Sequence, residues 1–229
     1  MVLKGLAQCS KGQEDRDLLK PDWWYNWGVG DLSDPTFVPM LYNGYAESGL
    51  PFGYSGYVLV FNEPNNPSPF GCDVPYYPES VTRYAVLANL YPHAKFIVGG
   101  VSAWDWSWIV SFHKMAVRCH LRLPVGYAIH GYANDYGTLT QMFSWWKYAH
   151  DKIKTITSAS EFWVTETSDM HGNPSVLETI YNKIVSYNFE RMAVYTNQQP
   201  EGANYAIDKR VDLVKDNNLT PLGIKYTEL

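Results

Sequence analysis

The chain has 229 residues, of which 46% are apolar and 18% are charged, a balance typical of folded globular proteins and unlike that of disordered chains or coiled coils. It contains no uninterrupted apolar run of about 18 residues, so a membrane-spanning helix is not expected. The net charge is −5 and no Lys/Arg cluster stands out, so we expect neither nucleic acid nor a membrane surface as a partner.

Aromatic residues are unusually frequent, with nine Trp and eighteen Tyr. We expect some of these rings to line a surface that binds sugars, apolar ligands or proteins. The three cysteines, Cys9, Cys72 and Cys119, are widely spaced, which indicates neither a disulfide framework nor a Cys-based metal site. The polar N-terminus shows no secretory signal, although a secreted chain without its leader would read the same.

Eight short runs rich in apolar, β-branched and aromatic residues recur along the chain and predict strands. Several are continuous rather than alternating, which favours strands buried on both faces, as in a parallel sheet. In chain order they cover residues 3–9, 22–27, 37–42, 57–62, 95–100, 126–132, 161–166 and 192–197.

Helix-like periodicity appears between the later strands, and Asn173-Pro174-Ser175 is a typical helix start. The connections between the first four strands are shorter, with at most a brief helix at residues 15–20 and Gly- and Pro-rich loops at 28–36 and 43–55. The other expected helices cover residues 78–90, 106–121, 139–156, 175–189 and 204–215.

Strands that alternate with connectors in this way predict a single (β/α)8 TIM barrel over residues 1–229, with shortened helices in the first half. An open doubly wound sheet is the alternative. No Gly-x-Gly-x-x-Gly follows a strand and no Walker-type Gly-Lys-[Ser/Thr] occurs, so nucleotide-binding forms of that sheet lose support.

The active site of such a barrel lies at the C-terminal ends of its strands. The residues expected there suit a polyhydroxylated ring, because carboxylates act on a glycosidic bond, amides bind hydroxyl groups and aromatic rings stack on C–H faces. They include Asn26, Trp27, Tyr42, Asn62, Glu63, Ser102, Trp104, His130, Tyr132, Glu166 and Tyr195.

Glu63 and Glu166 follow the fourth and seventh strands, which lie across the barrel mouth from each other. In a retaining glycosidase two carboxyl groups stand about 5–5.5 Å apart, one as nucleophile and one as acid/base. A lone Glu more often caps a helix or pairs with Arg, but two at these positions favour the catalytic interpretation.

Two segments resemble signatures of the clan A glycoside hydrolases, namely Val60-Phe61-Asn62-Glu63-Pro64 and Trp163-Val164-Thr165-Glu166. More narrowly, residues 24–28, 37–40, 61–64 and 128–132 resemble family 128, small (β/α)8 endo-β-1,3-glucanases related to a fungal cell-wall protein with an alkali-sensitive linkage. Residues 219–223 are similar to the end of many clan A barrels.

This resemblance implies that Glu63 is the general acid/base and Glu166 the nucleophile. It implies that Asn62 binds the 2-hydroxyl of the reacting sugar, and that His130 and Tyr132 hold hydroxyls or orient the nucleophile. The chain lacks the Trp with which many clan A enzymes end strand eight, so the ring beneath the reacting sugar is Tyr195 or comes from elsewhere. Strand six ends His-Gly-Tyr instead of His-Trp-Tyr, which bears on the glycan preference.

Other aromatic residues have two interpretations. Trp104 follows strand five and is a candidate sugar contact, whereas Trp108 is expected in a helix core and Asp105 as a helix N-cap. At the end of the second strand, Asn26 and Trp27 are the candidate substrate-binding residues.

No metal-binding motif occurs, so neither a metal nor a cofactor is expected, and the absence of Gly-x-Ser-x-Gly argues against an α/β-hydrolase. The sequence thus predicts a monomeric, retaining, endo-acting hydrolase of polysaccharide or oligosaccharide β-glucan, with β-1,3 preference; short loops after the first strands suggest an open groove. The alternatives are a clan A enzyme acting on β-1,4-glucan, xylan or mannan, and a non-catalytic glycan-binding barrel.

Overall fold

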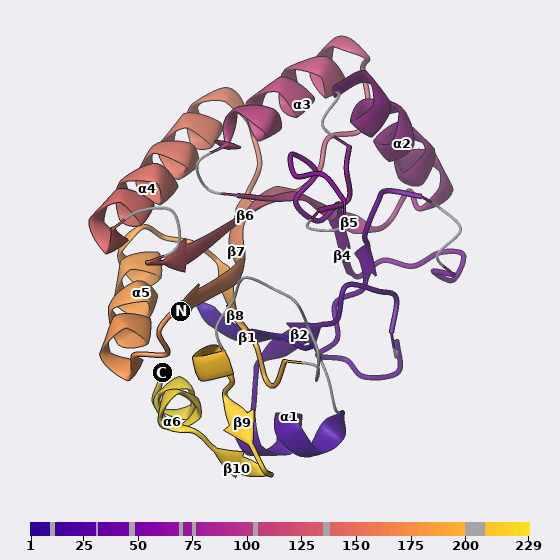
Figure 1. Cartoon of the computed structure of the whole chain (residues 1–229). Helices are drawn as coiled ribbons and strands as arrows, with labels where there is room; N and C mark the ends of the chain where they lie inside the picture. Colours follow the sequence, from indigo (N-terminus) through magenta and orange to yellow (C-terminus); the bar gives the residue numbers. More distant parts are fainter. Residues whose placement is uncertain are drawn as a thin grey trace.

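Eight parallel strands form one sheet that curls into a barrel, with helices on its outside (Figure 1). Their order is β2-β1-β8-β7-β6-β5-β4-β3, and a parallel bridge between Trp24 and Phe37 joins the two edges. The predicted TIM barrel is therefore confirmed. The strands are β1 (Leu3–Ala7), β2 (Trp23–Tyr25), β3 (Met40–Leu41), β4 (Tyr57–Val60), β5 (Lys95–Ser102), β6 (Gly126–Ala133), β7 (Glu161–Asp169) and β8 (Arg191–Tyr195).

This computed structural model describes residues 1–9, 12–30, 32–45, 49–68, 71–74, 77–102, 105–134, 138–199 and 209–229. The long helices lie where the periodicity predicts them. The first half is indeed sparse, since α1 has seven residues and the described residues between β2 and β4 form no helix. The helices are α1 (Gln13–Leu19), α2 (Tyr77–Leu90), α3 (Ser107–Arg118), α4 (Leu139–Ile156), α5 (Pro174–Ser186) and α6 (Pro221–Glu228).

Local sequence signals explain where two of these helices begin. The Asn173 side chain accepts a hydrogen bond from the Ser175 amide at 3.0 Å, which confirms the predicted start of α5. Thr138 and Gln141 form a reciprocal capping box at the start of α4. By contrast, Asp105 does not cap α3, because the N-cap residue of that helix is Trp106. The Asp105 carboxylate instead accepts a hydrogen bond from the Ser107 hydroxyl.

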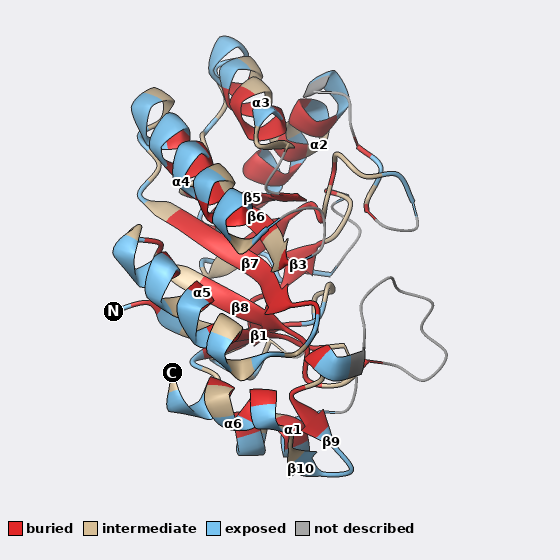
Figure 2. Ribbon diagram, turned by 60° about the vertical axis from the view of Figure 1, so that its left-hand side comes forward, coloured by how far each residue is buried: buried red, intermediate tan, exposed pale blue. Residues whose placement is uncertain are grey.

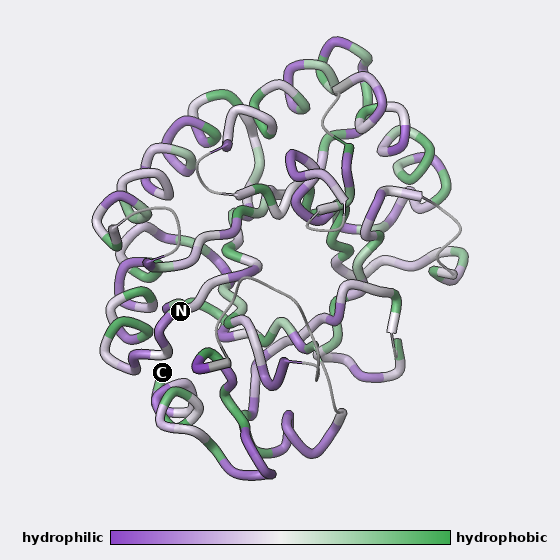
Figure 3. The backbone as a smooth tube through the Cα atoms, viewed as in Figure 1, coloured by the Kyte–Doolittle hydropathy of each residue, from purple (hydrophilic) through white to green (hydrophobic). Residues whose placement is uncertain are grey.

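Apolar side chains fill both sides of the sheet, as the continuous strand patterns predict. In β4, Val58 and Val60 belong to the outer core between strands and helices, while Leu59 belongs to the inner core of the barrel. The strands are buried, and the helices turn buried faces inward and exposed faces outward (Figure 2). The hydropathy of the helices alternates accordingly along the chain (Figure 3).

Rings occupy much of the barrel interior. Trp23 and Trp163 are almost wholly buried there, with ring centroids 5.1 Å apart. The Arg191 guanidinium lies 4.4 Å from the Trp163 ring centroid and 4.6 Å from that of Tyr57, a cation–π arrangement at the start of β8. Part of the aromatic surplus of the sequence is therefore core material.

The C-terminal part differs from the prediction of a helix over 204–215. Residues 204–208 lie outside the described residues, 209–211 form a single 3-10 turn, and Val214–Lys215 is strand β9, which pairs with β10 (Asn218–Leu219). Asp216 and Asn217 both have positive φ (50° and 59°), the backbone of a two-residue hairpin turn that Asp and Asn favour. Helix α6, which was not predicted, follows and packs on β1, where the Tyr226 hydroxyl donates to the Gly5 carbonyl at 3.1 Å.

Two further features bear on the sequence analysis. None of the described helices combines the length and apolar character needed to cross a membrane. Cys9, Cys72 and Cys119 are all free thiols.

Candidate active site

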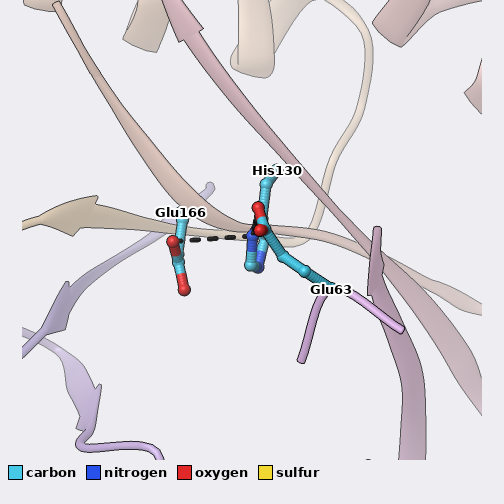
Figure 4. Close-up of side chains that lie close together, drawn as sticks. All are labelled: Glu63, His130 and Glu166. Carbon is cyan, nitrogen blue, oxygen red and sulfur yellow. Dashed lines mark hydrogen bonds and ion pairs between the residues drawn. The ribbon is translucent and has the colours of Figure 1, made fainter. Parts of the chain in front are cut away.

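Glu63, His130 and Glu166 converge at the C-terminal mouth of the barrel (Figure 4). One carboxylate oxygen of each Glu and one His130 ring nitrogen lie within 4.8 Å of one another. His130 Nδ1 is 3.0 Å from Glu63 Oε1 and 3.5 Å from Glu166 Oε2, so the imidazole bridges the two carboxylates. The strand-end rule thus places both predicted acidic residues in one site.

Unusual backbone conformations aim Glu63 into the mouth. Phe61 and Glu63, just beyond β4, have φ values of 69° and 43°, in the left-handed region that few non-Gly residues adopt. The Glu63 amide donates to the Gly100 carbonyl at 3.0 Å, which ties this turn to β5. Residues held in this way often mark functional sites.

A pair of glycines in β5 shapes the strand beside the histidine, and one of them, Gly100, makes room for it. Gly99 and Gly100 have φ values of 123° and 61°, and the β5–β6 register shifts between Gly99 and Val101. A Cβ on Gly100 would lie 3.0 Å from His130 Nε2, so a larger residue would crowd the imidazole. The β6–β7 register shifts between Ile129 and His130, which sets His130 opposite Glu166.

Glu166 was predicted to end the seventh strand, but β7 continues to Asp169, so Glu166 lies within the strand. The extension exists because β6 continues beside it, pairing as far as Ala133↔Asp169. Asp169 is wholly buried and accepts hydrogen bonds from the Asn134 side chain and the Asn173 amide. It therefore secures the loop that follows β7.

Uncharged donors surround the Glu166 carboxylate. The Trp27 indole N–H donates to Oε1 at 2.9 Å, and the Tyr132 hydroxyl donates to Oε2 at 2.6 Å. The Tyr25 hydroxyl lies 3.1 Å from Oε1 and 2.9 Å from the Thr165 carbonyl. Both oxygens of Glu166 therefore accept hydrogen bonds from N–H or O–H groups.

The tyrosines remain donors throughout the neutral range. Burial, reinforced by the nearby Glu166 carboxylate, holds the pKa of both Tyr25 and Tyr132 well above the ordinary value. Neither hydroxyl therefore ionises at neutral pH, and neither presents a negative charge to Glu166.

The Glu63 carboxylate has a different set of partners. The Asn66 amide donates to Oε2 at 2.7 Å, the Ser102 hydroxyl lies 3.4 Å from Oε1, and His130 reaches the same Oε1. Sequence reasoning missed Asn66 and Tyr25. Asn66 lies three residues after Glu63 within the turn, and Tyr25 lies inside the aromatic segment 23–27, so only their neighbourhood hinted at them.

Burial and the two carboxylates have opposite effects on the pKa of His130. Burial lowers the pKa of its ring, but the Glu166 and Glu63 carboxylates outweigh that effect, and the pKa is raised above the ordinary value. Its Nε2 atom is buried without a hydrogen-bond partner among the described residues. The ring therefore directs its Nδ1–H toward the two carboxylates.

Aromatic rings form a wall beside the carboxylates. The Tyr195 ring packs edge-on against Trp27 and Tyr132, with centroids 5.9 Å away in each case. Trp27 has a φ of 59°, which turns this bulky residue back over the mouth. Tyr195 thus lies at the end of β8, the position at which many clan A enzymes carry the Trp beneath the reacting sugar.

The remaining predicted residues are less closely involved. Asn62 is buried, hydrogen-bonds Tyr42, and keeps its Oδ1 without a partner among the described residues. Asn26 is exposed and is not among the described side chains that hydrogen-bond either carboxylate. Trp104 lies outside the described residues.

The three converging residues are also, within the described ranges, the one group of His, Cys, Asp or Glu close enough to hold a metal ion. An ion there would compete with the N–H and O–H donors that already occupy both oxygens of Glu166. This arrangement suits a free carboxylate better than a metal ligand.

Comparison with protein families gives one match, since residues 7–226 fit a family model described as "Glycosyl hydrolase catalytic core". No curated protein matches the sequence.

Several solved structures share the fold. An endo-β-1,3-glucanase of family 128 from Amycolatopsis mediterranei, in complex with laminaritriose, is 16% identical over 100% of this chain and 99% of its own (TM-score 0.70). A curdlan-specific exo-β-1,3-glucanase of the same family from Blastomyces gilchristii is 21% identical over 99% and 98% (TM-score 0.72). A family 128 oligosaccharide-binding protein from Trichoderma gamsii is 17% identical over 99% and 93% (TM-score 0.67).

Proposed function

Since this chain belongs to the glycosyl hydrolase catalytic core family, we propose that it is a retaining, endo-acting hydrolase of β-glucan with a preference for β-1,3 linkages. We take residues 1–229 as one catalytic domain that acts as a monomer on polysaccharide or oligosaccharide substrates. Glu166 is the nucleophile and Glu63 the acid/base.

The observation that carries this proposal is the proximity of the two carboxylates. One oxygen of each carboxylate and one His130 ring nitrogen lie within 4.8 Å of one another. Retaining glycosidases hold the two groups about 5–5.5 Å apart, whereas inverting enzymes need about 6.5–9.5 Å to admit a water molecule between acid and base. The short separation therefore supports direct attack by one carboxylate.

Their surroundings support the assignment of roles. Glu166, with an exposed side-chain fraction of 8%, accepts strong hydrogen bonds on both oxygens, as suits a carboxylate that must be charged to attack. Glu63 is more exposed, at 16%, as suits a group that must reach a leaving oxygen and then a water molecule. The proposed order of events follows from these positions.

In the first step, an oxygen of Glu166 forms a bond to the anomeric carbon while the glycosidic C–O bond breaks. Glu63 gives its proton to the departing oxygen. In the second step, water attacks the anomeric carbon, its proton passes to Glu63, and the bond to Glu166 breaks, returning the electron pair to the carboxylate.

The linkage and the endo action are inferred from the similar structures and from the segments that follow the first strands. The resemblance is to β-1,3-glucanases, of which the similar structures include an endo and an exo enzyme. The described residues between β2 and β4 form no helix that would cover the mouth, which favours a groove open at its ends. The oligosaccharide-binding protein of the same fold is the reason to keep binding without catalysis as the second candidate.

The test is release of reducing sugar from laminarin, curdlan, cellulose, xylan and mannan by the wild type, Glu63→Gln and Glu166→Gln. We expect activity on laminarin and curdlan, oligosaccharides of several lengths as early products, and loss of activity in both variants.

Other results would change specific parts of the proposal. Activity only on a β-1,4 polymer would remove the linkage preference, and early release of one short product would remove the endo action. A folded wild type that binds laminarin oligosaccharides without cleaving them would favour the binding protein.

A further inference from the structure

One contact that the sequence did not predict joins Trp27 to the proposed nucleophile. The resemblance treats Glu166 as the attacking group, and Trp27 was expected to stack on sugar. The indole N–H instead donates to Glu166 Oε1 at 2.9 Å. An indole nitrogen is a donor only and does not release its proton near neutral pH, so this bond has one direction at every stage of a reaction.

The other donors to Glu166 are divided or lie on the other oxygen. Tyr25 has a single hydroxyl hydrogen, and its oxygen lies closer to the Thr165 carbonyl than to Glu166 Oε1. Tyr132 and His130 approach Oε2. Trp27 is therefore the committed donor to Oε1. In the described part of the chain, no Lys or Arg nitrogen lies within ion-pair distance of Glu166.

The backbone is arranged to make this contact. Trp27 has a φ of 59°, a conformation that is unfavourable for a bulky residue and that persists where its surroundings impose it. The Met40 amide donates to the Gly28 carbonyl at 2.8 Å and fixes the turn to β3, while the Tyr25 and Tyr195 rings pack edge-on against the indole. The N–H is thus held before substrate arrives.

We propose, on the basis of the proposed retaining mechanism, that Trp27 is a positioning residue that promotes release of the glycosyl group from Glu166. The charge on Glu166 is full in the free enzyme, partial in both transition states and absent in the covalent intermediate. A donor to Oε1 stabilises these states in that order. It lowers the barrier for breaking the bond to Glu166 and does not lower the barrier for forming it.

The test uses Trp27→Phe and an aryl β-laminaritrioside whose leaving group is dinitrophenolate. This leaving group departs without protonation, so the first step is fast and kcat reports release from Glu166, while kcat/KM reports the first step. We expect kcat to fall about tenfold, the effect of ~1.36 kcal/mol on the barrier. KM should fall with it, kcat/KM should stay within about twofold, and a glycosylated Glu166 peptide should accumulate.

Two further variants make the result specific. Trp145→Phe is the matched control, because Trp145 lies on α4, half-buried against the outer core and away from the carboxylates; its kinetic constants should equal those of the wild type. Tyr25→Phe removes the divided donor to the same oxygen, and we expect a smaller decrease in kcat in the same direction. It keeps the proposal testable if Trp27→Phe does not fold.

The outcomes separate this inference from the function on which it rests. A fall in kcat/KM with unchanged KM, or no change in either variant, would overturn the role of Trp27 while leaving the hydrolase intact. A wild type that releases no dinitrophenolate would overturn both. A Trp27→Phe enzyme that is slow but free of covalent intermediate would show that the indole acts in the first step, contrary to the proposal.

Discussion

The charge on His130 gives the folded protein a pH-dependent stability that can be measured directly. Its imidazole lies 3.0 Å from Glu63 and 3.5 Å from Glu166, with an exposed fraction of 1%. Because its pKa is raised in the folded state above 6.5, the protonated ring stabilises the fold fully below about pH 6.5. That contribution disappears as the pH rises through the raised value.

The chosen change is His130→Asn, because Asn retains an N–H donor on a short side chain but carries no charge. A hydrogen bond to a charged group contributes about 1.5–3 kcal/mol, and removing one partner of a buried ion pair costs about 3–5 kcal/mol. With one close contact and one longer one, we expect the variant to lose about 3 kcal/mol of unfolding free energy at pH 5.5. At pH 9 a larger share of His130 is neutral than at pH 5.5, so the loss should be smaller and should approach the value of about 1–1.5 kcal/mol for one neutral hydrogen bond and ring packing.

The assay is urea unfolding followed by Trp fluorescence at both pH values. His150→Asn is the control with the opposite sign. His150 is also buried, but burial lowers its pKa despite the hydrogen bond that the Asp151 carboxylate accepts from its ring, so its protonation destabilises the fold as the pH falls. The His150 variant should therefore gain relative stability in acid. Equal losses for His130→Asn at pH 5.5 and pH 9 would refute the reasoning, because packing alone would then explain them.

Three further predictions test the mechanism, the site backbone and a helix start. In Glu63→Ala, the hydrolysis of natural glucan should fall about 10²–10⁴-fold, and azide should yield a β-glycosyl azide; an α-product would contradict retention. Gly100→Ala should cost about 1–2 kcal/mol of unfolding free energy, from a φ of 61° and a 3.0 Å approach to His130, and should lower kcat/KM; wild-type kinetics would exclude this positioning role. Thr138→Ala removes the α4 capping box and should cost about 1 kcal/mol with kcat unchanged, as thermal unfolding and turnover would reveal.

The sequence predicted the barrel because burial on both faces leaves a clear trace in composition. Val58, Leu59 and Val60 are all apolar because Leu59 faces the core inside the barrel, whereas Val58 and Val60 face the core outside it. The spacing of Glu63 and Glu166 then followed from the rule that parallel strands end at one face. These are repeated, cumulative signals.

The parts that were missed depend on single backbone choices. The prediction of helix over 204–215 followed periodicity, whereas the positive φ of Asp216 and Asn217 turns the chain into a hairpin. His130 was expected in the site, but its place opposite Glu166 depends on a one-residue register shift in β6–β7, and the contact of Asn66 with Glu63 depends on the left-handed turn at Glu63. No periodic pattern encodes such events, so they were not predictable from hydropathy.

The aromatic content shows how composition can point to the right chemistry for a partly different reason. The excess of rings suggested a sugar-binding surface, yet Trp23 and Trp163 fill the barrel interior. At the mouth, Trp27 and Tyr132 supply an N–H and an O–H to the oxygens of Glu166. Trp27 and Tyr132 do not ionise near neutral pH, so the charge of neither donor changes there. His130 contacts both carboxylates and can titrate, which makes it the donor whose charge depends on pH. A pH dependence of activity near neutrality should therefore weaken in His130→Asn and persist in Trp27→Phe, and the reverse result would place the titrating group elsewhere.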